Sequence, residues 1–277
     1  MKREFHLIVD VGNSTTVFGL FEDKKYIASV TTNTRLDNDK VRNDKLYNLL
    51  SDFKDAEIKD GMIFSVVPEL NKKLVKLIKK IFKFEITIFD WNNYEFKEKD
   101  PRITDKIGAD LLADIVGAKQ IYGYPCMVMD LGTVNKLLLI DNKGIFVGAS
   151  FNPGMEISLK LFGQNTSLLP SLDKVSSMSE RTGLSTVESM HHGVYWETVS
   201  YIRHEQKAQE ELNKMPIKLI LTGGNSPLVQ KEIENKVYDP LLTLKGMNIL
   251  FKEAQKWVIN QFWKVIAKKC LKKSKIL

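Results

Sequence analysis

The sequence of 277 residues predicts an α/β protein made of two similar lobes with a cleft between them. One observation is that short runs rich in Leu, Ile and Val alternate with stretches whose apolar residues recur at helical spacing. Another is an internal repeat, because Val9–Phe21 (VDVGNSTTVFGLF) and Met129–Asp141 (MDLGTVNKLLLID) share hydrophobic–Asp–hydrophobic–Gly, a small polar residue and a second strand-like run. The repeated aspartates, Asp10 and Asp130, lie 120 residues apart. We therefore predict a duplicated domain, with lobes at residues 1–123 and 124–250 and a tail at 251–277.

In the first half we predict strands at residues 5–10, 16–21, 26–31, 62–67 and 86–89. We predict helices at 36–52, 68–82 and 108–121, and a loop at 91–105. The helix at 68–82 has Pro68 as a suitable first residue and an apolar face that includes Leu70, Leu74 and Leu77. The second half begins in the same way, with strands predicted at 127–130, 136–140 and 145–150.

Composition places the chain among ordinary globular proteins, with 43% hydrophobic and 27% charged residues. No apolar run reaches the roughly 18–20 residues of a membrane span. The first residues lead straight into a predicted strand, so we expect no signal peptide. Cys126 and Cys270 lie far apart without metal-ligand spacing, which excludes a disulfide scaffold or a zinc site as the organising element. We expect a protein of the reducing cytoplasm.

The net charge of +7 comes entirely from the tail, which holds eight lysines and one acid. Since residues 1–250 are neutral overall, a basic surface spread through the fold is not expected, and neither is a nucleic-acid partner. The tail also has an apolar helical stripe that includes Trp257, Phe262 and Ile266. Such a helix docks on its own domain, rests on anionic lipid or binds an acidic partner. We expect the first of these, and no stable membrane association.

Residues 10–16 (DVGNSTT) place a carboxylate at a strand end, a glycine at the turn and small hydroxyl residues after it. Glycine permits close approach of backbone N–H groups to a phosphate, and the hydroxyls add donors. An aspartate beside phosphates usually holds a metal ion or its water, because like charges repel. An ordinary hairpin turn favours the same residue types. The repeat at residues 130–133 (DLGT) favours the phosphate interpretation, since two such hairpins can face each other across a cleft.

Paired Asp-x-Gly hairpins resemble the superfamily of actin, the sugar kinases and the heat-shock chaperone ATPases. Within it, the order of further motifs is similar to that of the type III pantothenate kinases. The motifs of this chain are DVGNSTT, GAD, DLGT, NPG, SLLP, GLST, LTGG and TLKGM, at residues 10–16, 108–110, 130–133, 152–154, 167–170, 183–186, 221–224 and 243–247. The resemblance spans residues 5–250 and implies two actin-like (ribonuclease H-like) lobes.

The resemblance implies ATP-dependent phosphorylation of pantothenate to 4′-phosphopantothenate, the first step toward coenzyme A. It implies Mg²⁺ with ATP, a monovalent cation (K⁺ or NH₄⁺) held by Asp130, and a homodimer whose second subunit closes the pantothenate pocket. Asp110 is the implied general base. The implied ATP contacts are Asp10, Val11, Gly12, Asn13, Ser14, Thr15, Thr16, Val17 and Thr133. The implied pantothenate contacts are Gly108, Ala109, Asp110, Leu111 and Thr186.

This chain departs from the family pattern at three places. The family's tyrosine ahead of an Asn-Pro pair has no clear match, and Asp100-Pro101 is the nearest pair. Leu111 follows Asp110 where the family has arginine, and residues 134–136 (VNK) stand where Ala-Thr-Thr is usual. Lys136 either supplies a replacement charge or, by strand alternation, points into solvent. The departures leave two alternatives open, a family member that binds nucleotide without this activity and a kinase for another small hydroxylated substrate.

Other residues have simpler interpretations. Asp105 and Asp114 flank Asp110, and we expect both to be solvated. Asp110 itself lies near a predicted helix start, where the helix dipole alone favours an acid. Gly223 and Gly224 either let a nucleotide base approach the backbone or form a strand-to-helix turn.

Overall fold

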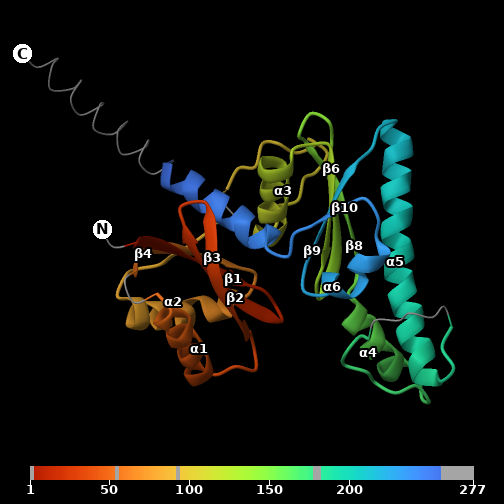
Figure 1. The fold of residues 1–277 in the computed structure, drawn as a ribbon, viewed down its shortest axis with the longest axis horizontal. Helices are drawn as coiled ribbons and strands as arrows, with labels where there is room; N and C mark the ends of the chain where they lie inside the picture. The colour runs from red at the N-terminus through yellow and green to blue at the C-terminus, as the bar shows by residue number, and fades with distance from the viewer. Residues whose placement is uncertain (1–2, 54–55, 92–93, 177–181, 257–277) are drawn as a thin grey trace, which may run out of the picture. The chain divides into compact units, whose positions relative to one another are not determined.

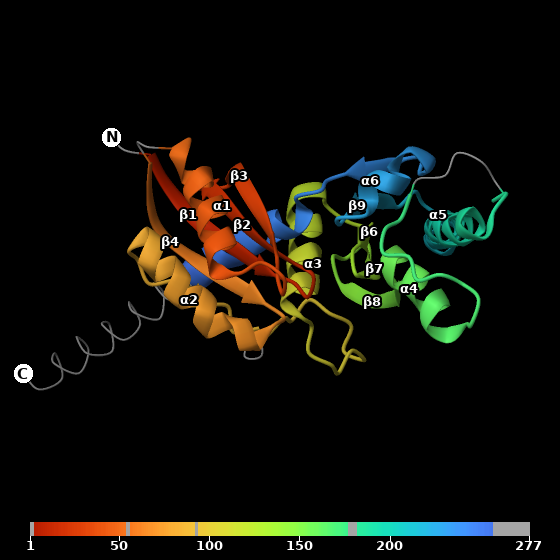
Figure 2. The ribbon, with the colours of Figure 1, turned by 90° about the horizontal axis from the view of Figure 1, so that it is seen from below.

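The structure is a computed structural model that describes residues 3–53, 56–91, 94–176 and 182–256. Its contacts divide the chain into two compact units, one formed by residues up to Asp90 together with those from Leu244 onward, the other by Trp91–Thr243. Each unit contains one five-stranded sheet (Figures 1 and 2).

The first sheet has the order β3-β2-β1-β4-β5. Its strands are β1 (Arg3–Val11), β2 (Thr15–Glu22), β3 (Lys25–Asn33), β4 (Ala56–Ser65) and β5 (Thr87–Ile88). The first three form an antiparallel meander, and β4 and β5 add parallel to β1. Helices α1 (Asp39–Ser51) and α2 (Pro68–Phe82) cover one face, where Leu46 and Ile78 pack on Phe5, Leu7 and Val9.

The other face of the first sheet carries the helix at residues 242–256. A Cβ at Gly19 would lie 3.4 Å from the Leu244 side chain of this helix, and the ring centroids of Phe251 and His6 are 5.4 Å apart with the rings tilted by 56°. Phe251, the first residue of the predicted tail, is buried. That the apolar stripe of the tail docks on its own domain stays a prediction. The tail from Trp257 onward lies outside the described residues.

The second sheet has the order β10-β9-β6-β7-β8. Its strands are β6 (Cys126–Leu131), β7 (Val134–Ile140), β8 (Phe146–Pro153), β9 (Lys218–Thr222) and β10 (Lys236–Tyr238). Strands β6, β7 and β8 form the meander, and β9 and β10 add parallel to β6. This is the order and direction of the first sheet repeated, which confirms the predicted fold of two duplicated actin-like (ribonuclease H-like) lobes.

Helices cover both faces of the second sheet (Figure 1). On one face α3 (Ala109–Tyr122) packs Ile115 and Ala118 on Val128, Leu138 and Ile220. On the other face lie α4 (Met155–Asn165) and the 28-residue α5 (Thr186–Asn213). A short α6 (Ser226–Val229) and a 3₁₀ turn, η1 (Gln230–Glu232), connect β9 to β10.

The contacts group residues differently from the predicted division of the chain at residues 123 and 124. Helix α3 groups with the second unit because its apolar side packs on β6 and β7, and the helix from Leu244 onward groups with the first. The three-part division into residues 1–123, 124–250 and 251–277, like the cleft between the lobes, stays a prediction.

Candidate functional site

Two motifs of the second unit, GAD and DLGT, meet at one lysine, Lys136. The Lys136 ammonium on β7 lies 2.6 Å from Asp130 Oδ2 on β6 and 2.9 Å from Asp110 Oδ2 on α3. All three side chains are largely covered, with 17% of the Lys136 side chain, 10% of Asp130 and 28% of Asp110 exposed. Distances in this range are typical of charge-assisted hydrogen bonds.

Strand register explains why these groups meet. Lys136 pairs directly with Asp130 across the antiparallel β6–β7 ladder, and Thr222 on β9 pairs with Asp130 on its other side. Side chains at paired positions share a face of the sheet, so the three residues form a polar row across β7, β6 and β9. Two residues earlier on β6, Val128 belongs to the apolar core under α3. The polar row therefore faces the first turn of α3, where Asp110 lies.

The register also decides between the two alternatives for Lys136, since its side chain points to the carboxylates and not into solvent. Burial alone would lower the pKa of the Lys136 ammonium, but attraction by Asp130, Asp110 and Asp114 outweighs it and raises the pKa above its usual value. The side chain therefore carries a full positive charge at neutral pH.

Asp114 is fully buried, and the expectation that it is solvated is wrong. Asp110 and Asp114 are four residues apart, so they share a face of α3, and this face lies against the sheet. Asp114 Oδ1 accepts a hydrogen bond of 2.7 Å from the Thr243 hydroxyl, whereas Oδ2 has no hydrogen-bond partner among the described residues. Burial first, and then repulsion by Asp130 and Asp110, raise the pKa of the Asp114 carboxyl well above its usual value despite Lys136 and Thr243. Asp105 is exposed, as expected.

Asp114 should make stability depend on pH. Because its pKa is higher in the folded state than in the unfolded one, its contribution to stability is greatest below the unfolded value of about 4 and falls as pH rises toward the folded value. We expect the melting temperature of Asp114→Asn to fall less than that of the wild type between about pH 5 and 8. Parallel melting curves at several pH values measure this. Equal pH slopes for the two proteins would contradict it.

Two glycines hold neighbouring loops against the Asp130 hairpin. A Cβ on Gly154, in the NPG motif, would overlap the carbonyl oxygens of Gly132 and Thr133, and the Gly154 N–H donates to the Thr133 carbonyl at 3.0 Å. Gly223, in the LTGG motif, has a φ of +92°, and its Cβ would lie 2.4 Å from Asp130 Oδ1. The NPG and LTGG motifs therefore pack directly on the DLGT turn. The atoms that lie close to Gly223 belong to Asp130 and Leu131 of the chain itself, as in an ordinary strand-to-helix turn.

The hairpin of the first unit repeats this turn. Its Gly12 N–H donates to the Thr15 carbonyl at 3.0 Å, and the Thr34 hydroxyl donates to the Gly12 carbonyl at 2.8 Å. Asn13, Ser14 and Thr15 are exposed at its tip. The remaining predicted ATP contacts lie in the adjoining strands: Asp10, Val11, Thr16 and Val17. Of these the Thr16 hydroxyl is buried and bonded to Thr34 at 2.9 Å, so the exposed donors are at the tip.

The order of these motifs matches a known family over most of the chain. The family model for type III pantothenate kinase matches residues 6–207. The chain belongs to this family. The type III pantothenate kinase of Endomicrobium trichonymphae is 31% identical over 261 residues, which cover 89% of this chain and 98% of that protein. That of Agathobacter rectalis is 29% identical over 255 residues, covering 89% and 96%.

A solved structure agrees with the fold. The chain is similar to a conserved putative Baf family transcriptional activator from Campylobacter jejuni, with a TM-score of 0.55 and 20% identity. The match covers 90% of this chain and 99% of the other. At this identity the likeness shows the shared fold alone.

The family's predicted pantothenate contacts are only partly brought together. Gly108, Ala109 and Asp110 form the start of α3, and Leu111 packs against the apolar core under that helix. Thr186 is exposed at the first turn of α5, where Ser185 caps the helix by accepting from the Glu188 N–H. Helices α3 and α5 cover opposite faces of the second sheet. Within this unit Thr186 therefore does not contact Asp110.

The two ions implied for the family fit the residues differently. Among the described residues, no group of three or more His, Cys, Asp or Glu is arranged to hold a metal ion. Mg²⁺ that accompanies ATP is usually held by phosphates with one or two carboxylates, and Asp10 near the end of β1 is the carboxylate of the first hairpin. A K⁺-like ion at Asp130 fits poorly, because the Asp130 carboxylate already binds the Lys136 ammonium. That Asp130 holds such an ion stays a prediction.

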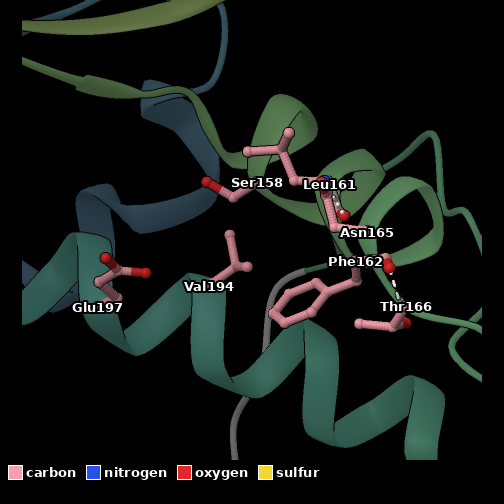
Figure 3. Close-up of a pocket in the computed structure, with 7 residues that line it drawn as sticks. All are labelled: Ser158, Leu161, Phe162, Asn165, Thr166, Val194 and Glu197. Atoms are coloured by element: carbon pink, nitrogen blue, oxygen red, sulfur yellow. Dashed lines mark hydrogen bonds between the residues drawn. The ribbon is translucent and has the colours of Figure 1, made fainter.

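A separate cavity of about 290 Å³ lies between α4 and α5 (Figure 3). Figure 3 shows Phe162 of α4 and Val194 of α5 lying between the two helices. Its lining residues are Ser158, Leu161, Phe162, Asn165, Thr166, Val194 and Glu197. The cavity is on the face of the sheet opposite α3 and contains none of the predicted site residues.

None of the described helices combines the length and apolarity that crossing a bilayer requires.

Proposed function

We propose that this chain phosphorylates pantothenate to 4′-phosphopantothenate with ATP, the first step of coenzyme A synthesis. The observation that carries the proposal is the meeting of Asp110, at the family's general-base position, with the Asp130 hairpin across the Lys136 ammonium. Membership of the type III pantothenate kinase family supports the reaction class and the substrate.

In this proposal the two hairpins bind the ATP phosphates. Asn13, Ser14 and Thr15 are exposed at the tip of the first, and Thr133 is exposed in the second. Backbone N–H groups and hydroxyls at such turns suit phosphate oxygens. Asp10 would hold the Mg²⁺ that accompanies ATP, and the ion would offset negative charge on the phosphates.

Asp110 would accept the proton of the pantothenate hydroxyl. The transition state of phosphoryl transfer is loose in most analyses, so the proton leaves late and the base needs correct position more than strength. Asp110 lies in the first turn of α3 and is held there by Lys136 at 2.9 Å. The ammonium would thus fix the carboxylate and offset charge near the reacting oxygens.

The pantothenate pocket would be built from the start of α3 and from Thr186 of a second subunit. The positions of α3 and α5 on opposite faces of one sheet support a contribution from another copy of the chain. The homodimer and the cytoplasmic location are parts of this proposal.

An assay of ADP release and phosphopantothenate formation tests the proposed reaction. Purified protein with Mg-ATP and pantothenate, in a buffer containing K⁺, should release ADP only when pantothenate is present. ATP binding without pantothenate-dependent turnover would overturn the proposal.

The second candidate is a family member that binds nucleotide but does not phosphorylate pantothenate. The observation that favours it is Leu111, which packs on the core and leaves no cation at the position where the family has arginine. Under this alternative Leu111→Arg would gain activity that the unaltered chain lacks. A screen of other small hydroxylated substrates would then separate a binding protein from a kinase of different specificity.

A further inference from the structure

The site at Asp130 already contains a singly charged cationic group that belongs to the chain itself, the Lys136 ammonium. The Lys136 ammonium donates to Asp130 Oδ2 at 2.6 Å and to Asp110 Oδ2 at 2.9 Å, from a side chain that is 17% exposed. Its charge is the same as that of a K⁺ or NH₄⁺ ion, and –NH₃⁺ has the hydrogen-bonding chemistry of ammonium.

The surrounding charges require a cation at this place. Asp110, Asp114 and Asp130 lie around the ammonium, and the described part of the chain shows no other Lys or Arg in ion-pair contact with them. Removing the ammonium would leave the largely covered Asp130 and Asp110 carboxylates without the cation that the described residues supply, which is strongly destabilising. Lys136 meets this need from within the chain.

A cationic side chain differs from a free ion because it does not have to bind from solution. A free ion must be captured from solution, and its occupancy depends on its concentration. An ammonium on a strand is present at a fixed effective concentration in every molecule. Register fixes its place, because Lys136 is the direct β7 partner of Asp130.

We propose that Lys136 is a built-in monovalent cation, which replaces a free K⁺ or NH₄⁺ ion at Asp130 and makes this chain's activity independent of such ions. The claim about activity rests on the proposed pantothenate kinase function. The claim that the carboxylate cluster binds a free cation only when Lys136 is removed is independent of that function.

The test compares the wild type with Lys136→Ala, which leaves room for an ion, and Lys136→Gln, which keeps most of the side-chain length without the charge. Lys143→Ala is the matched control, because Lys143 is an exposed lysine in the turn after β7. Tetramethylammonium chloride serves as the inert salt and is replaced by KCl or NH₄Cl at constant ionic strength.

Turnover of pantothenate is the first readout. We expect the rates of the wild type and Lys143→Ala to change by less than about twofold between the salts, since surface screening is the same at equal ionic strength. Lys136→Ala should lose about 100-fold in tetramethylammonium and regain about tenfold in roughly 100 mM KCl or NH₄Cl. A merely structural lysine would not give this rescue by small cations.

Thermal unfolding without substrate is the second readout. The melting temperature of Lys136→Ala should rise by about 3 °C when KCl or NH₄Cl replaces the inert salt, and that of the wild type by less than about 1 °C. Lys136→Gln provides the same comparison if the alanine variant does not fold.

The inference is overturned if K⁺ or NH₄⁺ stimulates the wild type by about tenfold or more, or raises its melting temperature as much as that of Lys136→Ala. It is also overturned if neither the turnover nor the melting temperature of the two Lys136 variants changes when KCl or NH₄Cl replaces tetramethylammonium chloride. A wild type that is inactive in every salt would instead refute the proposed function, and unfolding would then decide the inference alone.

Discussion

Asp110→Asn should reduce pantothenate-dependent turnover by about 10³-fold, since a positioned general base typically contributes 10²–10⁴-fold. The amide keeps the shape of the side chain, and its oxygen still accepts from Lys136, which now lies 2.9 Å from Asp110 Oδ2. What is lost is the ability to take up the hydroxyl proton. ATP binding, measured by calorimetry, should stay within about threefold of the wild type, because the predicted phosphate contacts lie in the two hairpins.

Asp105→Asn is the matched control for this variant. Asp105 is exposed and precedes α3. Its replacement by Asn removes the same charge as Asp110→Asn, at a position five residues away. Its turnover should stay within about twofold of the wild type, as expected for a surface substitution. If Asp110→Asn keeps wild-type kcat, or if both variants lose activity equally, Asp110 is not the base.

Gly223→Ala should destabilise the protein by about 3 kcal/mol or more, because backbone strain and overpacking add at this position. The φ of +92° is unfavourable for any residue with a Cβ, and the new Cβ would lie 2.4 Å from Asp130 Oδ1 and 2.5 Å from the Leu131 nitrogen. Either the LTGG loop or Asp130 must move. The Asp130–Lys136 ion pair, at 2.6 Å, would be displaced with it.

Differential scanning calorimetry measures this effect, with an expected fall in melting temperature of about 6–12 °C for a chain of this size. The adjacent Gly224→Ala is the control, because a Cβ there meets nothing within 4 Å. It should change stability by no more than about 0.5 kcal/mol. Equal melting temperatures for the two variants would show that the close approach at Gly223 is relieved without cost.

Most strands and the duplication were predictable from sequence because they depend on local patterns. Apolar runs and turn residues located β1, β2 and β3, and their counterparts β6, β7 and β8, to within a few residues. The predicted helix at 36–52 begins only at Asp39, since the preceding residues form a turn in which the Asp37 carboxylate accepts from the Asn33 N–H at 2.9 Å. Such side-chain capping of a turn is difficult to distinguish from a helix start in a polar stretch.

The candidate site was only partly predictable. Asp110 and Asp130 were singled out by motif, but Asp114 was misjudged as solvated, although its spacing of four from Asp110 was a signal that both share a helix face. Thr243 was not assigned to the site, because its hydroxyl reaches Asp114 from 129 residues away in sequence. Contacts of that separation leave no local pattern to detect.

The sequence by itself determined the fold class, the repeat, the family and the positions of the two hairpins, because periodicity and motif order are properties of short segments. Only the tertiary structure decided where Lys136 points, that Asp114 is buried, and that Gly154 and Gly223 pack on the Asp130 turn. These outcomes depend on strand register and on which helix covers which face of the sheet. Burial and ion pairing arise from the joint packing of distant segments, and so they are decided only when the chain has folded.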